Sequence, residues 1–275
     1  MILINNKEVN FTVFPNGETH IDSIQFYQLC KDPDNCNVSF KYESDSDLIK
    51  LMFVKRHLDT LNLDSNLIIY YMPYSRMDRT EGEKVFTLKY VAEFINSLKF
   101  KNVFVYQPHS DVTSALLNNC TAINSSIRLL EESIDMIGFD KDRDYIYYPD
   151  SSAEKHFSKS NSYKGLVGLK QRDFSTGRIT KLDVVGDLPQ EKGFKVVMID
   201  DLCSRGGTFM LGASKLKELG ASEIYLVVTH CENSIFEGDI FKTDLIDKVF
   251  TTNSIIHENK ANERLQILNL SKGEF

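Results

Sequence analysis

The chain has 275 residues, of which 42% are hydrophobic and 26% charged. These are ordinary values for a globular protein and exclude collagen-like, disordered and disulfide-scaffold classes. Its 32 basic and 39 acidic residues give a formal net charge of −7, which argues against nucleic-acid binding through a broad basic face and leaves small anionic ligands open. The five cysteines are scattered and form no CxxC pair, and no run has the length of a membrane span. We therefore expect reduced thiols and a cytoplasmic protein that binds neither nucleic acid nor a membrane.

Short apolar runs typical of buried strands alternate along the chain with stretches of helical periodicity. In chain order, we expect helices at 47–61, 87–100 and 208–220, and strands at 67–72, 102–107, 144–150, 194–200 and 223–231. This alternation predicts an α/β fold with mainly parallel sheets flanked by helices. The length accommodates two similar domains, which we place at residues 1–128 and 129–275.

Two stretches, 73–86 and 170–193, are poor in regular pattern. Each follows an expected strand and carries several cations. Ligands of open α/β sheets bind beyond the carboxyl ends of the strands. We therefore expect both stretches to be loops that contribute to a site.

The segment VVMIDDLCSRGGTF, residues 196–209, predicts a phosphate site. An apolar strand ends at Asp200 and Asp201, and a turn leads from there into a helix; the turn residues are Ser204, Arg205, Gly206, Gly207 and Thr208. Glycines allow successive N–H groups to face one anion, and the helix N-terminus adds donors. The two carboxylates can accept hydrogen bonds from vicinal hydroxyls, so the segment suits a ribose phosphate. The alternative is a strand–turn–helix joint in which Asp201 only caps the helix.

This segment resembles the phosphoribosyl diphosphate motif shared by phosphoribosyltransferases and ribose-phosphate diphosphokinases, the PRPP synthetases. Other stretches resemble synthetase motifs in the same order: FPNGE (14–18), PYSRMDR (73–79), QPHSD (107–111), PDSSAEK (149–155), KQRD (170–173) and TTNSI (251–255). A transferase would not show the first five. The chain is therefore identified as a member of the synthetase family, which implies two phosphoribosyltransferase-like domains.

The resemblance implies a reaction and its participants. The β,γ-diphosphate of Mg-ATP is transferred to the C1 hydroxyl of a 5-phosphoribosyl acceptor, and AMP leaves. The partners are then ATP and a small molecule containing ribose phosphate, with Mg²⁺ as cofactor. Because the family's ATP contacts come from two subunits, a homo-oligomer of at least two chains is expected.

The resemblance also implies roles for individual residues. The catalytic residues are Lys170, Arg172 and His109, and metal contacts come from His109 and Asp150. ATP is bound by Phe14, Asn16, Glu18, Arg76, Asp78, Arg79 and His109. The acceptor is bound by Asp200, Asp201, Ser204, Arg205, Gly206, Gly207 and Thr208.

Each of these positions also has a plainer structural interpretation. Residues 14–18 suit a β-hairpin turn, and Asp150 suits a helix N-cap. Arg76 and Arg79 have Asp78 and Glu81 nearby in sequence as ion-pair partners, His109 suits a structural histidine, and Lys170 and Arg172 suit a solvated surface.

The phosphate loop departs from the family pattern. The family commonly reads Asp-Thr-Gly-Gly-Thr where this chain has Ser204-Arg205-Gly206-Gly207-Thr208, so one negative charge is lost and one positive charge gained. Arginine presents several donors and can stack on a base, which suits an acceptor with a 5′-diphosphate. Met77 replaces a polar residue of the ATP segment, and the family's usual last helix is not expected after the strand at 265–270.

These departures resemble a divergent phage branch of the family that acts in a host cytoplasm. Its acceptor is ADP-ribose and its product, ADP-ribose pyrophosphate, serves NAD salvage. We favour this acceptor over ribose 5-phosphate, the acceptor of an ordinary PRPP synthetase. Less favoured are a phosphoribosyltransferase, which needs no ATP, and an inactive regulatory subunit, which the retained Lys170, Arg172, His109, Asp150, Asp200 and Asp201 oppose.

Overall fold

The computed structural model describes residues 1–30, 36–80, 82–160, 162–172 and 179–270, and it divides the chain into two compact units. The N-terminal unit is Met1–Asn124 and the C-terminal unit is Ser125–Leu270. The division falls after residue 124, whereas the sequence analysis places it after residue 128. Helix α5 (Ser125–Ile137) belongs to the second unit because its apolar side chains pack on the second sheet.

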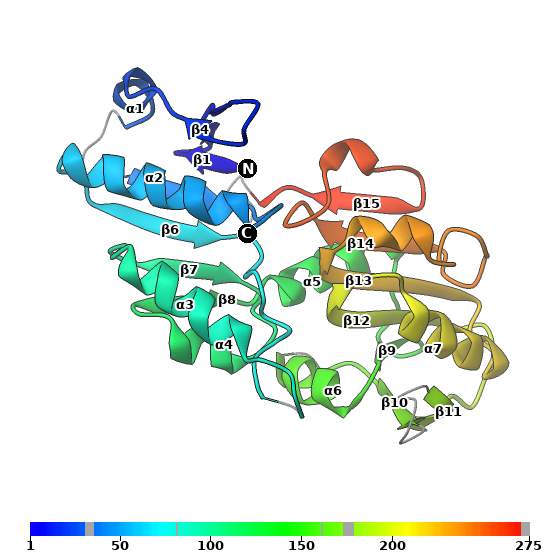
Figure 1. Ribbon diagram of the computed structural model, residues 1–275. Helices are drawn as coiled ribbons and strands as arrows, with labels where there is room; N and C mark the ends of the chain where they lie inside the picture. The colour runs from blue at the N-terminus through cyan, green and yellow to red at the C-terminus, as the bar shows by residue number, and fades with distance from the viewer. Residues whose placement is uncertain (31–35, 81, 161, 173–178, 271–275) are drawn as a thin grey trace. The chain divides into compact units, whose positions relative to one another are not determined.

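The N-terminal unit is built on a six-stranded sheet (Figure 1). The strand order is β2 (Lys7–Glu8), β1 (Ile2–Ile4), β5 (Cys36–Phe40), β6 (Ser65–Ile69), β7 (Val103–Tyr106) and β8 (Cys120–Ile123). Strands β5 to β8 are parallel, whereas β1 pairs antiparallel with both neighbours. The helices are α1 (Ile24–Leu29), α2 (Ser46–Thr60), α3 (Thr87–Ser97) and α4 (Asp111–Leu116). A separate hairpin joins β3 (Thr12–Val13) to β4 (Thr19–His20).

The C-terminal unit contains a seven-stranded sheet. The strand order is β11 (Ile179–Gly186), β10 (Gly165–Arg172), β9 (Tyr145–Tyr148), β12 (Lys195–Cys203), β13 (Glu223–Cys231), β14 (Lys248–Thr252) and β15 (Leu265–Leu268). All neighbours are parallel except β10 and β11. The other helices are α6 (Ser151–Phe157) and α7 (Gly207–Glu218), with short 3-10 turns η1 (Ser158–Ser160), η2 (Asn233–Glu237) and η3 (Glu258–Lys260).

The second sheet is covered on both faces, which explains why its strands are apolar throughout. Tyr147 and Met198 pack in a core with α7, whereas the neighbouring residues Ile146 and Val197 pack in a second core with α5 and α6. Successive strand residues point to opposite faces, so each strand contributes to both cores. This arrangement fixes the place where β12 runs into α7.

The expected fold class is confirmed, and the expected helices and strands are present with ends shifted by a few residues. One expectation is wrong: the stretch 170–193 is not an irregular loop, because β10 continues to Arg172 and pairs antiparallel with β11. The sequence of β11, ITKLDVVG, does not alternate regularly between apolar and polar residues, so its pattern alone does not reveal the strand. No helix in the described part of the chain is long and apolar enough to span a membrane.

Candidate active site

The turn between β12 and α7 has the shape that the sequence predicted for a phosphate loop. Gly206 adopts φ +79°, and a Cβ atom there would lie 2.3 Å from Cδ1 of Ile240. The position therefore requires glycine for both backbone and space. A Cβ atom at Gly207 would meet no atom within 4 Å, so the space beside the start of α7 is open.

Helix α7 begins without a side-chain cap. Its N-cap residue is Gly206, whose carbonyl accepts a hydrogen bond from the Met210 N–H at 3.0 Å. The N–H groups of the first turn precede that bond and are the donors that a helix leaves for an anion. The N-cap residue is Gly206, five positions after Asp201, so Asp201 does not occupy the N-cap position of this helix.

The adjacent carboxylates of Asp200 and Asp201 lie at the entrance to this loop. Both residues are half-buried, and Oδ1 of Asp200 accepts a hydrogen bond from the Asp201 N–H at 2.9 Å. Burial, followed by the charges of Asp201 and Asp150, raises the pKa of Asp200 well above its usual range. Burial and the neighbouring negative charges therefore favour the protonated form of Asp200.

Asp150 connects two elements of the same unit. One oxygen accepts hydrogen bonds from the N–H groups of Ser152 and Ala153, both at 3.1 Å, and so caps α6. The other lies 3.1 Å from Nζ of Lys170, whose side chain is only 11% exposed. Burial acts to raise the pKa of Asp150, but the hydrogen bonds from Ala153 and Lys170 outweigh it and hold the pKa below its usual range. Asp150 thus caps α6 and, as an ionised carboxylate, also pairs with Lys170.

The expected basic pair at 170 and 172 is only partly described. Lys170 lies in strand β10, opposite Leu182 of β11, and not in a loop as we expected. The backbone of Arg172 ends the same strand, but its side chain lies outside the described part of the chain, as do residues 173–178. The C-terminal unit therefore contains the candidate phosphate loop, the carboxylates of Asp200 and Asp201, and the Lys170–Asp150 ion pair.

Within the N-terminal unit, Asp78 links the 73–80 segment to the turn before α4. Its carboxylate accepts hydrogen bonds from Arg79 (Nε at 2.8 Å and Nη2 at 3.2 Å) and from the Ser110 hydroxyl at 2.6 Å. The Arg79 guanidinium holds the pKa of Asp78 below its usual range against burial, and the charge of His109 contributes. The ion-pair alternative for Arg79 is thus present, while Arg76 and His109 are exposed. Glu81 lies outside the described residues.

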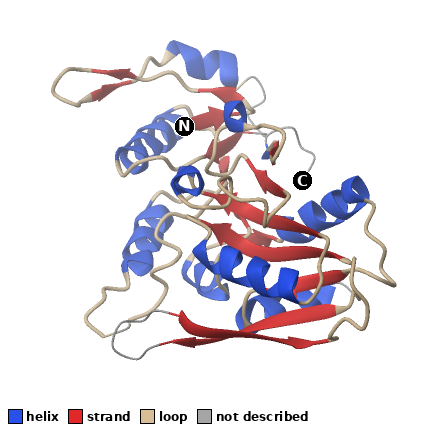
Figure 2. Cartoon of the chain, turned by 90° about the vertical axis from the view of Figure 1, so that its right-hand side faces the viewer, coloured by secondary structure: helices blue, strands red, loops and turns tan. Residues whose placement is uncertain are grey.

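Residues 14–18 form the turn of the β3–β4 hairpin, which extends from its unit (Figure 2). The Phe14 N–H bonds the Glu18 carbonyl at 2.8 Å, the Asn16 side chain donates to Glu18 at 2.7 Å, and Gly17 has φ +87°. The turn interpretation is therefore correct. Phe14 is 48% exposed, so the turn presents an aromatic ring and polar groups to the surroundings.

Sequence reasoning missed a segment that packs on the phosphate loop. Ser234 hydrogen-bonds Ser204 at 3.0 Å, and Glu237 forms an ion pair with Arg205 at 2.7 Å. Only Gly238 hinted at a close backbone approach in this segment. The TTNSI motif has a structural role, because hydroxyls of Thr251, Thr252 and Ser254 donate to the carbonyl of Thr229 in a buried network.

No group of three or more His, Cys, Asp or Glu side chains gathers closely enough to hold a metal ion among the residues searched, which are those described. The donor set at Asp200 and Asp201 nevertheless suits Mg²⁺, which prefers carboxylate oxygens and takes its remaining ligands from water and substrate phosphates. Both oxygens of Asp150 already accept hydrogen bonds, from Ser152 and from Lys170.

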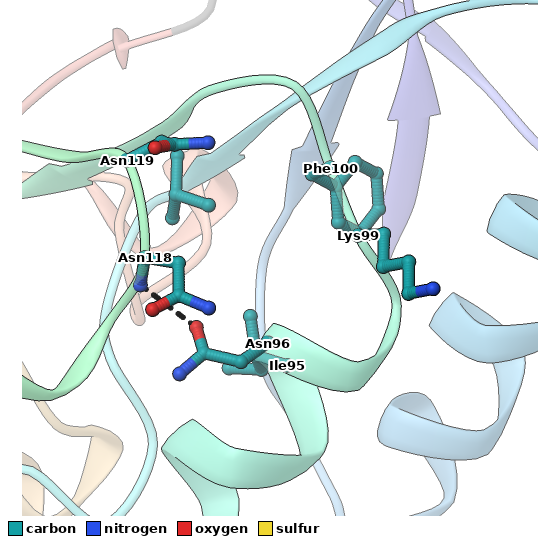
Figure 3. A pocket seen from close by; sticks show the side chains of 7 residues that line it. Ile95, Asn96, Lys99, Phe100, Asn118 and Asn119 are labelled. Atoms are coloured by element: carbon teal, nitrogen blue, oxygen red, sulfur yellow. Dashed lines mark hydrogen bonds between the residues drawn. The ribbon is translucent and has the colours of Figure 1, made fainter.

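A pocket of about 310 Å³ lies elsewhere in the N-terminal unit, between the end of α3 and the start of β7 (Figure 3). The Asn96 side chain accepts from the Asn118 N–H at 2.8 Å and donates to the Leu116 carbonyl at 2.8 Å. Lys99 directs its ammonium away from the asparagines. The pocket offers no carboxylate pair and no glycine loop, so we assign it no part in the site.

Comparisons with known proteins agree with these motifs. A family model described as "Phosphoribosyl synthetase-associated domain" matches residues 156–272. The ribose-phosphate pyrophosphokinase of Mycoplasmopsis pulmonis is 27% identical over 277 aligned residues, covering 96% of this chain and 82% of the relative. That of Thermococcus kodakarensis is 25% identical and covers 90% of this chain and 86% of the relative.

A solved structure, the phosphoribosylpyrophosphate synthetase from Mycobacterium smegmatis, aligns with a TM-score of 0.74 at 19% identity. The alignment covers 96% of this chain and 87% of that one, and it shows a shared fold of two phosphoribosyltransferase-like domains. The comparisons together support the PRPP synthetase family for this chain. They do not distinguish a branch of it.

Proposed function

We propose that this chain, as a relative of the ribose-phosphate pyrophosphokinases, transfers the intact β,γ-diphosphate of ATP to the C1 hydroxyl of a ribose phosphate and releases AMP. One observation carries the proposal: the uncapped glycine turn at the start of α7 directly follows the carboxylates of Asp200 and Asp201. A phosphate on the turn and two hydroxyls on the carboxylates would fix both ends of a ribose ring. Acceptor-dependent release of AMP from Mg-ATP tests this proposal.

In this proposal, the acceptor is oriented by the phosphate loop and the carboxylate pair. The N–H groups at Gly206, Gly207 and Thr208, with the Ser204 hydroxyl, bind the 5′-phosphate. Asp200 and Asp201 accept hydrogen bonds from the ribose hydroxyls and leave the C1 hydroxyl exposed to attack the β-phosphorus. Positioning of this kind is the main requirement of phosphoryl-type transfer, because no covalent enzyme intermediate is needed.

Lys170 and Arg172 are proposed to stabilise the negative charge that develops on the transferring diphosphoryl group. Lys170 is held ready by Asp150 in a largely buried environment, where a charge acts more strongly than in water. Transfer of Lys170 from Asp150 to the phosphoryl oxygens would keep the lysine paired throughout.

Mg²⁺ would be held in the C-terminal unit by Asp200 or Asp201 with water-mediated contact to Asp150. Separately, within the N-terminal unit, His109 is proposed as a metal contact. When bound, the ion neutralises phosphate charge. The elevated pKa of Asp200 is consistent with a site that gains a cation on loading.

ATP is proposed to bind through residues of the N-terminal unit. Arg76, Asp78, Arg79 and His109 would contact its phosphates and ribose, while Phe14, Asn16 and Glu18 of the exposed turn would contact adenine. We propose that this turn serves a neighbouring subunit of a homo-oligomer, since it stands apart from the sheet of its own unit.

Two acceptors are compatible with the loop. The names of the relatives support ribose 5-phosphate. Arg205 supports ADP-ribose as a second candidate, because its side chain is 72% exposed at the loop and can meet a second phosphate. Arg205→Thr should lower kcat/KM for ADP-ribose relative to ribose 5-phosphate roughly tenfold or more. An unchanged ratio would remove Arg205 as an acceptor determinant.

A further inference from the structure

Residues 232–241, here called the acceptor-side wall, run along the phosphate loop. Two polar links join them: the Ser204 hydroxyl lies 3.0 Å from that of Ser234, and Arg205 Nη2 donates to Glu237 Oε2 at 2.7 Å. Ser234 in turn donates to Glu232 at 3.0 Å. The wall therefore contacts the two loop residues at which this chain departs from its family's pattern.

The wall also fits closely against the loop backbone. A Cβ atom at Gly238 would lie 1.9 Å from the carbonyl oxygen of Arg205, and one at Gly206 would lie 2.3 Å from Ile240. Ile240 is fully buried. The two segments are therefore closely packed, and the wall is a fixed neighbour of the phosphate loop.

Two aromatic residues of this wall, Phe236 and Phe241, stack on each other. The rings of Phe236 and Phe241 are stacked, with centroids 5.4 Å apart and planes inclined by 23°. Arg264 lies over the Phe241 ring at 5.8 Å and donates to the carbonyls of Ile240, Thr243 and Ile246, which fixes the segment that carries Phe241. Phe236 remains 40% exposed, so the stack ends in an open aromatic surface.

We propose that Phe236, together with the Arg205–Glu237 pair, forms a subsite for the purine end of an acceptor that continues beyond the loop-bound phosphate. This rests on the proposed function with ADP-ribose as acceptor. A base gains roughly ten- to a hundredfold in affinity by stacking on an aromatic side chain. An exposed ion pair contributes little stability, so Arg205 can exchange Glu237 for the second phosphate of the acceptor.

The absence of tryptophan from the chain permits a direct test. Phe236→Trp introduces the single tryptophan of the chain at the end of the stack, and Tyr90→Trp introduces one at an exposed position of α3 as the control; the tryptophan emission is excited selectively at the red edge, away from the tyrosines. Without ATP present, ADP-ribose should quench the fluorescence of the Phe236→Trp protein saturably. Ribose 5-phosphate should not, and the Tyr90→Trp protein should respond to neither. Equal quenching by ATP alone, or no response to ADP-ribose, overturns the subsite.

Kinetics provide the second arm. Phe236→Leu should lower the ratio of kcat/KM for ADP-ribose to that for ribose 5-phosphate about tenfold, whereas Tyr90→Leu should leave the ratio unchanged. If the wild-type protein uses ADP-ribose but Phe236→Leu keeps the ratio, the subsite is wrong and the acceptor proposal survives. If the wild-type protein releases AMP only with ribose 5-phosphate, ADP-ribose fails as acceptor and the subsite fails with it.

Discussion

At the scale of single residues, the ammonium group of Lys170 forms an ion pair with the carboxylate of Asp150. Its side chain is 11% exposed and its partner, Asp150, is itself fixed by the N-terminus of α6. The hydrogen bonds that fix Asp150 also keep it ionised and therefore able to hold the lysine. This arrangement preorganises a positive charge without leaving it unpaired.

Replacing this lysine should affect the reaction more than ATP binding. We expect Lys170→Ala to lower kcat about a hundredfold or more, because a preorganised charge acts chiefly on the transition state. ATP affinity, measured by calorimetry, should change much less. The control is Lys181→Ala, which removes an exposed lysine of β11 that pairs with Asp183. Near-normal turnover in Lys170→Ala would remove this residue from the mechanism.

Asp200 gives a prediction about pH. Since its pKa is raised in the folded protein, the native state binds the proton more tightly than the unfolded chain, and the free energy of unfolding falls as pH rises above about 4. Asp200→Asn removes this loss, so its melting temperature relative to wild type should be higher at pH 8 than at pH 5. Adding Mg²⁺ should reduce the difference in melting temperature between the two proteins at pH 8, because the cation would stabilise the ionised carboxylate of the wild-type protein.

The control for this measurement is Asp244→Asn, which removes one negative charge from an exposed position in the same unit. Its melting temperature relative to wild type should vary less with pH. If the melting temperature of Asp200→Asn relative to wild type does not rise between pH 5 and pH 8, the pKa of Asp200 is not raised in the folded protein.

At the scale of elements, the turn between β12 and α7 contains two adjacent glycines with different duties. Gly206 has a positive φ angle and no room for a Cβ atom, whereas Gly207 begins the helix beside open space. The first is required by the fold. The second is required only if a ligand uses that space.

These two glycines make a matched pair of variants. Gly206→Ala should lower the melting temperature and the activity together, because alanine is strained there. Gly207→Ala should keep the melting temperature and raise the acceptor KM roughly tenfold, because its methyl group enters the proposed phosphate position. A Gly207→Ala protein with an unchanged acceptor KM would place the phosphate elsewhere.

Sequence patterns predicted those elements whose signals are local. The β12 strand, its glycine turn and α7 are encoded within residues 194–220, so both their place and their shape were accessible. The β10–β11 arm was missed because its pairing is a tertiary contact. The same holds for the ion pair of Lys170 with Asp150 and for the wall at Ser234 and Glu237, since no local spacing links those residues.

At the scale of the whole molecule, the candidate residues divide between two units. Those proposed for the acceptor and for charge stabilisation lie in Ser125–Leu270, and those proposed for ATP lie in Met1–Asn124. The length of the chain suggested two domains, and the resemblance to the synthetase family implied the roles of both sets of residues. The resemblance of residues 14–18 to a synthetase loop that contacts ATP in a neighbouring subunit implies that this turn acts across subunits, and this stays a prediction.

Mixing inactive variants tests whether the exposed hairpin acts on a neighbouring subunit. Phe14→Ala combined with Glu18→Ala should impair ATP use, and Lys170→Ala should impair transfer. Subunits of the two variants, mixed after reversible dissociation, should regain part of the wild-type activity if the hairpin serves the neighbouring chain. Mixing each variant with itself is the control. No recovery in hetero-oligomers confirmed by mass spectrometry would assign the hairpin to its own chain.

The central claim is that the diphosphate of ATP moves as a unit to a ribose phosphate. Phosphorus NMR of a reaction containing Mg-ATP and either ribose 5-phosphate or ADP-ribose measures this directly. We predict acceptor-dependent formation of AMP, with an equal amount of a diphosphate attached to C1 of the acceptor and no ADP. Formation of ADP in place of AMP, or AMP formation that no ribose-phosphate acceptor stimulates, would contradict it.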